Sequence, residues 1–289
     1  MIDLHLHTNA SDGILPLEEL VKEAEQAGLS AIAITDHDTI QNARRIKELK
    51  SSIEIIAGVE FSIYDNKLDY IDLHVLGLFL DTESPKLIST LERLERERKE
   101  QKMAIIDKLN ELGYGVTYEE AKAKAKGAVG RPHIAKALIE KYPEKFKIIP
   151  DVFNKLLDKG KPAFQSRTAF FCLDEAVRLI HDSGGLAILA HPKVYKYDLS
   201  KLLQDFKAAG GDGIETIYDY ARNYYWKEYT QEDNLRLRKK MENLAKEMGF
   251  LESGGSDFHG PNKGAPLGTL DVPDEFLAKM RKSLDSNCG

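Results

Sequence analysis

The sequence predicts an α/β protein built as a (β/α) barrel. Short apolar, β-branched runs alternate with amphipathic helical patterns, which indicates parallel strands joined by helices. Potential metal ligands, mostly histidines, occur in short clusters, and each cluster lies at or just past the end of one of these runs. A barrel gathers the ends of its strands at one rim, whereas an open sheet spreads them along an edge. The barrel is therefore the fold that lets these side chains meet.

The predicted strands and helices follow one another along the chain. The strands are expected at residues 2–6, 31–35, 53–63, 70–80, 186–190, 213–218 and, with a weaker pattern, 250–254. Residues 17–27 have the i, i+3, i+4 spacing of a helix, and Gly28 follows as a natural helix end. A second helix is expected at 39–49 and another at 174–183, where His181 near the helix end has an ordinary structural use.

The alternation stops between about residues 84 and 165, where a long charged helix reaches about Leu112 before Gly113. Lysine-rich helical segments follow, so we expect residues 1–83 and 166–289 to form the barrel and 84–165 an inserted helical subdomain. Residues 119–167 hold twelve Lys or Arg against six Asp or Glu. This excess either favours an anionic substrate or marks a solvated helical face.

Composition limits the class of protein. The 289 residues are 42% hydrophobic, enough to bury a full core, and the net charge of −6 argues against non-specific wrapping of nucleic acid. Cys172 and Cys288 lack zinc-type spacing, and no apolar run approaches the roughly 20 residues that span a bilayer. We therefore expect a cytoplasmic protein with no membrane partner and no DNA-binding module. Ser11 and Ser256 have no paired base, so a serine hydrolase is not supported.

Nine potential metal ligands form the candidate site. Residues two apart on a strand face the same side, so His5 with His7, and Asp257 with His259, can each bind one centre. Imidazole and carboxylate without cysteine suit Mn, Fe(II), Zn or Co. At three or four protein ligands per ion, and with Glu60 free to bridge, nine ligands predict two or three divalent ions with open positions. The nine ligands are His5, His7, Asp12, His37, Glu60, His74, His191, Asp257 and His259.

These motifs resemble those of the PHP (polymerase and histidinol phosphatase) family, from residue 2 to about 268. The matching motifs are IDLHLHT at 2–8 with SDG at 11–13, TDHD at 35–38, GVEF at 58–61, LHVLG at 73–77, AHP at 190–192 and GSDFHG at 255–260. The resemblance implies a distorted seven-stranded (β/α) barrel of the PHP type, a trinuclear metal centre at its C-terminal rim, and phosphoester hydrolysis.

The resemblance also assigns ligands to ions. It implies a first ion on His5, His7, Glu60 and Asp257, a second on Glu60, His74 and His191, and a third on Asp12, His37 and His259. Glu60 would bridge the first two ions. Some members of the family carry histidine where this chain has Asp12, so occupancy of the third position is left open, and manganese is expected with iron or zinc as alternatives.

One motif points to a branch of the family. Gly130, Arg131, Pro132 and His133 resemble the branch with nucleoside 3′,5′-bisphosphate phosphatase and 5′-to-3′ exoribonuclease activity, in which the insert caps the barrel mouth. There Arg131 would bind phosphate oxygens and His133 would supply a hydrogen bond or a proton. The alternative is plain helix initiation around Pro132.

The expected enzyme is a metal-dependent phosphoesterase. Its substrate would be a small anionic phosphate ester or nucleotide, or short RNA, attacked by a metal-bridging hydroxide. The alternatives are another phosphomonoesterase of the family, such as a histidinol-phosphate phosphatase, a non-catalytic binding module and a purely structural metal protein. Four further residues are left open: Asp36 as a positioning residue, Asp38 as a helix cap or a positioning residue, and Glu215 and Tyr218 as pocket or packing residues.

Overall fold

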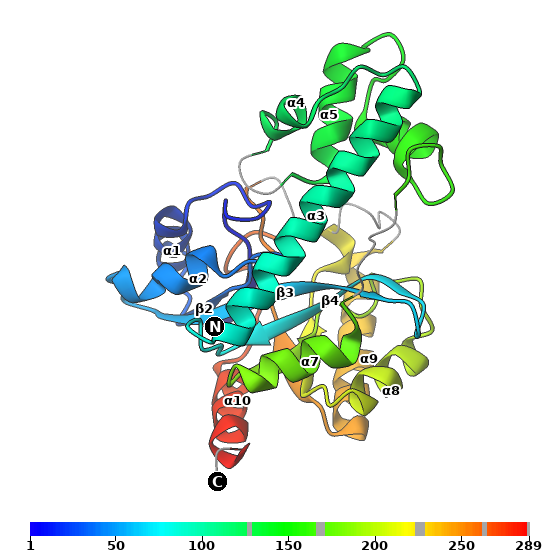
Figure 1. Ribbon diagram of the computed structural model, residues 1–289. Coiled ribbons are helices and arrows are strands. Elements are labelled where there is room, and N and C mark those ends of the chain that lie inside the picture. Colours follow the sequence, from blue (N-terminus) through cyan, green and yellow to red (C-terminus); the bar gives the residue numbers. More distant parts are fainter. Residues whose placement is uncertain (126–128, 166–170, 223–228, 262–264, 288–289) are drawn as a thin grey trace. The chain divides into compact units, whose positions relative to one another are not determined.

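The computed structural model describes residues 1–125, 129–165, 171–222, 229–261 and 265–287 (Figure 1). The chain divides into two compact units, Met1–Ser89 with Phe171–Gly289, and Thr90–Phe170. The boundaries expected for the insert, 84 and 165, fall near those of the second unit. That residues 84–165 form an inserted domain stays a prediction.

The described part of the first unit contains a seven-stranded sheet in the order β1 to β7. The strands are β1 (Ile2–Leu6), β2 (Ala31–Ile34), β3 (Glu54–Asp65), β4 (Tyr70–Leu78), β5 (Leu186–Leu189), β6 (Gly213–Ile217) and β7 (Leu251–Gly254). A parallel bridge joins Leu6 to Phe258, and the His7 amide donates to the Phe258 carbonyl at 3.0 Å. These bonds link β1 to the segment after β7, so the predicted barrel is confirmed.

Strand β4 departs from the all-parallel pattern that the alternation of strands and helices in the sequence predicts. It pairs antiparallel with β3 and with β5, while the other neighbouring pairs are parallel. Only residues 66–69 separate β3 from β4, which is too short for the crossover that parallel strands need. The expectation that every ligand lies at or past a strand end is therefore wrong for Glu60 and His74. Both lie within strands, and β3 continues to Asp65.

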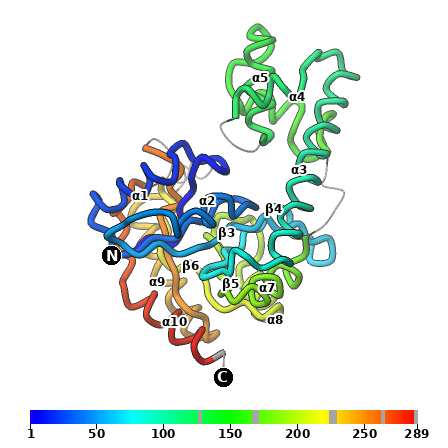
Figure 2. The backbone as a smooth tube through the Cα atoms, turned by 60° about the vertical axis from the view of Figure 1, so that its left-hand side comes forward, coloured from blue at the N-terminus to red at the C-terminus, as the bar shows by residue number. Residues whose placement is uncertain are grey.

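Helices surround the sheet (Figures 1 and 2). They are α1 (Leu17–Gln26), α2 (Gln41–Arg45) with a 3₁₀ turn (Ile46–Glu48), α7 (Leu173–Asp182), α8 (Leu199–Ala208), α9 (Gln231–Met248) and α10 (Asp274–Asn287). One apolar cluster takes side chains from all seven strands and is joined by Phe276 and Met280 of α10. This cluster is the filled interior of the barrel.

A shift in the pairing register of β1 with β2 lies next to His5 and His7, the first two candidate ligands. Ile2 and Leu4 belong to the interior cluster, but Leu6 packs with α1, and the pairing with β2 shifts between Asp3 and Leu6. Such irregularities commonly re-aim side chains. The Asp3 carboxylate accepts hydrogen bonds there from the amides of His5 (3.3 Å) and Ser256 (3.0 Å), and burial raises the pKa of Asp3 to about 6.

The second unit is helical. It contains most of α3 (Pro85–Glu111), followed by α4 (Tyr118–Lys122), α5 (Arg131–Lys141), α6 (Ile149–Val152) and a π-helical turn (Phe153–Leu157). Its own apolar cluster includes Ile106, Leu109, Leu138 and Leu156. Helix α3 ends at Glu111, close to the predicted end, and Gly113 follows with φ of 85°.

Two further expectations concern membranes and cysteines. Within the part of the chain that the structure describes, no helix has both the length and the apolar character needed to cross a membrane. Cys172 is a free, half-buried thiol, and Cys288 lies outside the described residues. The cytoplasmic location stays a prediction.

Candidate metal centre

The barrel rim brings together ligands that are far apart in sequence. His5 and His7 come from β1 and the residue after it, Glu60 and His74 from β3 and β4, and the others from loops after β1, β2, β5 and β7. The ligand atoms form three groups in which all of them lie within 4.8 Å of one another. These groups are His7, Asp12, His37 and His259; His5, His7, Glu60 and Asp257; and His37, Glu60 and His74.

Glu60 lies at the centre of the site and is 1% exposed. Its two oxygens face five imidazole nitrogens. Oε1 lies 2.8 Å from His74 Nδ1 and 3.2 Å from His191 Nε2, and Oε2 lies 3.3 Å from His5 Nε2, 3.1 Å from His7 Nε2 and 3.0 Å from His37 Nδ1. Burial alone would raise the pKa of Glu60, but the surrounding imidazoles hold it well below its usual range. Glu60 is therefore ionised and can act as a bridging carboxylate.

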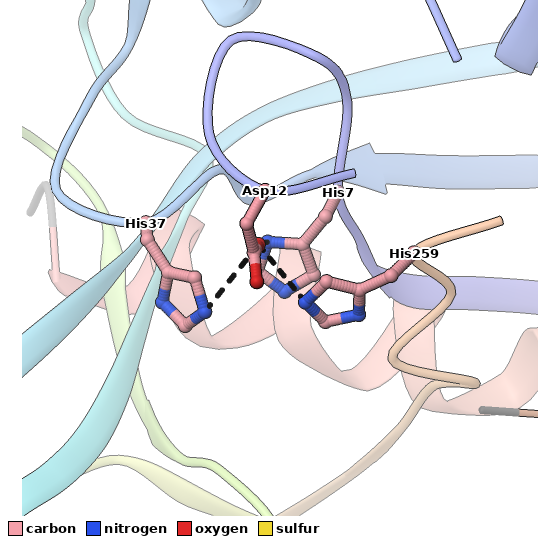
Figure 3. A group of neighbouring side chains, drawn as sticks. All are labelled: His7, Asp12, His37 and His259. Atoms are coloured by element: carbon pink, nitrogen blue, oxygen red, sulfur yellow. Dashed lines mark ion pairs between the residues drawn. The ribbon is translucent and has the colours of Figure 1, made fainter. Parts of the chain in front are cut away.

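A second carboxylate, Asp12, lies among three histidines (Figure 3). Its Oδ1 is 3.0 Å from His259 Nε2 and 3.8 Å from His37 Nε2. His259 Nδ1 donates to the Asp257 carbonyl at 2.7 Å, which leaves Nε2 as the nitrogen with a lone pair when the ring is neutral. Burial opposes ionisation of Asp12, but His259, His37 and His7 hold its pKa well below the usual range.

Asp257 and His191 have unusual backbone conformations. Their φ angles are 52° and 30°, in the left-handed region that non-glycine residues rarely adopt. Asp257 Oδ1 lies 3.2 Å from His7 Nε2, and Oδ2 accepts a hydrogen bond from the Tyr218 hydroxyl at 3.0 Å. Strain of this kind concentrates at functional sites, where the surrounding structure holds it in place.

The donor set fits divalent metal ions. Among the described residues, Asp12 Oδ1, Glu60 Oε2, His74 Nδ1 and His191 Nδ1 are buried, and the close contacts given above do not have the geometry of hydrogen bonds. A buried polar atom without a partner is costly, and a cation would satisfy such atoms. Imidazole and carboxylate donors without thiolate are the ligands of borderline and harder divalent ions.

The grouping differs in part from the one that the family resemblance implies. The group of His5, His7, Glu60 and Asp257 is the same. The group of Asp12, His37 and His259 also contains His7. The group of Glu60 and His74 contains His37 in place of His191. His191 instead contacts Glu60 through its Nε2. Which residue binds which ion therefore stays a prediction.

Residues that the sequence left open hold the ligands in place. Glu215 Oε1 lies 3.0 Å from His5 Nδ1, and Glu215 Oε2 accepts the His191 amide at 2.6 Å. The only sequence signal for Glu215 is its position near the end of a predicted strand, on the rim that carries the ligands. Tyr218, by its bond to Asp257, also belongs to the site.

The two aspartates that flank His37 have different structural roles. The Asp36 carboxylate accepts hydrogen bonds from the Thr8 amide (2.8 Å) and the Ser11 hydroxyl (2.6 Å), so it holds the loop that carries Asp12. Asp38 accepts the Ser62 amide at 2.8 Å. Helix α2 begins without a side-chain cap, so the helix-cap interpretation of Asp38 is wrong.

Arg131 and His133 lie at the start of α5 in the second unit. The Arg131 guanidinium is 5.6 Å from the centre of the Phe153 ring, and His133 Nδ1 accepts the Gly130 amide at 2.9 Å. Pro132 sits in the first turn of the helix. His133 thus contributes to helix initiation, and the contact of Arg131 and His133 with substrate stays a prediction. In the first unit, His181 pairs with Asp212 at 2.8 Å, as expected for a residue outside the site.

A (β/α) barrel whose rim gathers histidine and carboxylate side chains in this way is typical of metal-dependent hydrolases. A family model for the PHP domain matches residues 3–156. The chain is 35% identical over 286 residues to a 5′-3′ exoribonuclease of Haemophilus influenzae, covering 97% of this chain and 98% of that protein. The chain belongs to the PHP domain family, and it is a hydrolase acting on phosphoester bonds.

Two further matches, a curated protein and a solved structure, come from Chromobacterium violaceum. One is a 3′,5′-nucleoside bisphosphate phosphatase, 29% identical over 270 residues, which cover 91% of this chain and 88% of that protein. The other is a solved structure described as an amidohydrolase, with 29% identity and a TM-score of 0.74 over 96% of each chain. Both alignments run through the barrel and the helical second unit.

Proposed function

We propose that this enzyme hydrolyses nucleoside 3′,5′-bisphosphates, removes 5′ nucleotides from short RNA, or does both. The observation that carries the proposal is the alignment with the H. influenzae exoribonuclease over 97% of this chain, which includes the second unit as well as the barrel. The similarity to a nucleoside bisphosphate phosphatase supports the same substrate class. A histidinol-phosphate phosphatase is not favoured, because these relatives act on nucleotides or RNA.

The nine rim residues would hold two or three divalent ions, with manganese as the first candidate and iron or zinc as alternatives. Such ions lower the pKa of water toward about 7 and neutralise phosphate oxygens. Ionised Glu60 offers one oxygen to each side of the site, and imidazole nitrogens of the neighbouring histidines face both oxygens. The carboxylates of Asp12 and Asp257, whose pKa values are held low by neighbouring histidines, remain charged at neutral pH.

The second unit would supply substrate contacts. Arg131 has a planar fork of donors that matches the phosphate that is not cleaved. In hydrolysis a P–O bond to water forms and the P–O bond to ribose breaks, so the departing ribose oxygen needs a proton. We assign that proton to His133.

A comparison of three substrates tests the proposal. The manganese-loaded protein is incubated with adenosine 3′,5′-bisphosphate, with a short 5′-phosphorylated RNA and with histidinol phosphate. We expect 5′-AMP and phosphate from the bisphosphate, or 5′-mononucleotides from the RNA. Turnover confined to histidinol phosphate would overturn the assignment of substrate class.

A further inference from the structure

Glu215 connects two candidate metal ligands from different strands. It lies in β6 and is completely buried. Its Oε1 contacts the His5 ring, which β1 carries, and its Oε2 accepts the backbone amide of His191, which follows β5. A buried carboxylate is costly unless both oxygens are satisfied, and here each oxygen has its own partner.

The contact with His5 selects one tautomer of the neutral ring. An ionised carboxylate can only accept a hydrogen bond, so the nitrogen facing it, Nδ1, must carry the proton. The other nitrogen, Nε2, then keeps its lone pair. Nε2 faces the site, 3.3 Å from Glu60 Oε2 and 3.4 Å from Asp257 Oδ1. A metal ligand needs this arrangement.

The contact with His191 acts on the backbone. His191 has φ of 30°, a conformation that persists only where neighbouring groups hold it. The 2.6 Å bond from its amide to Glu215 is such a restraint. The restraint directs the His191 ring, whose Nε2 lies 3.2 Å from Glu60 Oε1.

We infer that Glu215 is a positioning residue that fixes the His5 tautomer and the His191 backbone together. It thereby links His5, which faces Glu60 Oε2, to His191, which faces Glu60 Oε1. The inference rests on the proposed function only in taking His5 and His191 as metal ligands. The identity of the phosphate ester does not enter it.

Substitution by glutamine separates this role from general packing. Glutamine has the same shape but one acceptor oxygen and one NH₂ donor group. If the oxygen accepts the His191 amide, the NH₂ group faces His5 Nδ1 and favours the tautomer with the proton on Nε2, which cannot bind metal. If the glutamine side chain is turned the other way, its NH₂ group faces the backbone N–H of His191, and two donors then meet without an acceptor. Either orientation removes one of the two ligands.

The test measures metal binding by Glu215→Gln and by a matched control, Glu252→Gln. Glu252 lies on neighbouring β7 and accepts a hydrogen bond from the Thr216 hydroxyl. In a Mn²⁺ titration of the metal-free proteins, we expect Glu215→Gln to weaken binding by about 10- to 100-fold, the usual effect of losing a carboxylate behind a histidine ligand. Glu252→Gln should bind as the wild type does. Wild-type affinity in Glu215→Gln would overturn the inference.

A second measurement uses the wild type and does not depend on the folding of a variant. Two-bond ¹H–¹⁵N correlation spectra of the Zn²⁺-loaded protein report the tautomer of each histidine ring. We expect His5 to carry its proton on Nδ1, and a proton on Nε2 would refute the role of Glu215. Both measurements can succeed even if none of the three phosphate esters is hydrolysed, so failure of the proposed function is distinguished from failure of this inference.

Discussion

Replacement of Glu60 by glutamine tests the metal centre most directly. The side chain is 1% exposed, and its two oxygens face five imidazole nitrogens at 2.8 to 3.3 Å. Glutamine keeps the volume but removes the negative charge and replaces one oxygen by NH₂. The imidazoles on one side of Glu60 would therefore face a donor group in place of an anion.

The expected loss follows from the two roles of the carboxylate. Removing one preorganised electrostatic group from an active site typically lowers kcat by about 10²- to 10³-fold. Because Glu60 lies between both sets of imidazoles, we expect the upper end, about 10³-fold, or about 4 kcal/mol. At least one equivalent of bound metal should be lost at the same time.

The assay combines phosphate release from adenosine 3′,5′-bisphosphate with metal content after manganese loading and desalting. Glu54→Gln is the control, since Glu54 is the first residue of the same strand and pairs with Arg281. This control should retain activity and metal. Full activity and unchanged metal content in Glu60→Gln would refute the bridging role.

Three further predictions address the substrate, the Asp12 loop and pH. Arg131→Ala should lower bisphosphate turnover about 10- to 100-fold more than turnover of an aryl phosphate, as expected for lost hydrogen bonds to a charged group; equal losses on both substrates would contradict its role. Asp36→Asn should loosen the loop that carries Asp12 and weaken Mn²⁺ binding about tenfold, and an unchanged titration would argue against that support. Burial lowers the pKa of His259, but Asp12 and Asp257 outweigh burial and raise it to about 9. In metal-free protein, protonated His259 therefore contributes stability that is fully present below about pH 6.5 and is lost as pH rises through about 9. The free energy of unfolding, measured by urea titration, should fall over this pH range. His259→Gln should remove this pH-dependent part of the unfolding free energy.

Much of the barrel could be predicted because its signals are local. Apolar alternation, glycine at helix ends and helical spacing depend on neighbouring residues, and the predicted strands 2–6 and 31–35 match β1 and β2 closely. The reversal of β4 was missed because strand direction depends on the loop at 66–69 and on pairing with distant β5. Sequence period gives the faces of a strand and says nothing of its direction.

The candidate ligands could be chosen from sequence, because histidine and carboxylate pairs at strand ends are unusual without a site. The sequence by itself therefore determined the fold class and the family, and it proposed the set of nine candidate ligands. Only the tertiary structure decided which of them meet. His37 joins Glu60 through a bridge between the β2 loop and β3, and Glu215 of β6 reaches His5 of β1. These distances result from strand register, barrel closure and loop conformation acting together, which no local pattern of residues specifies.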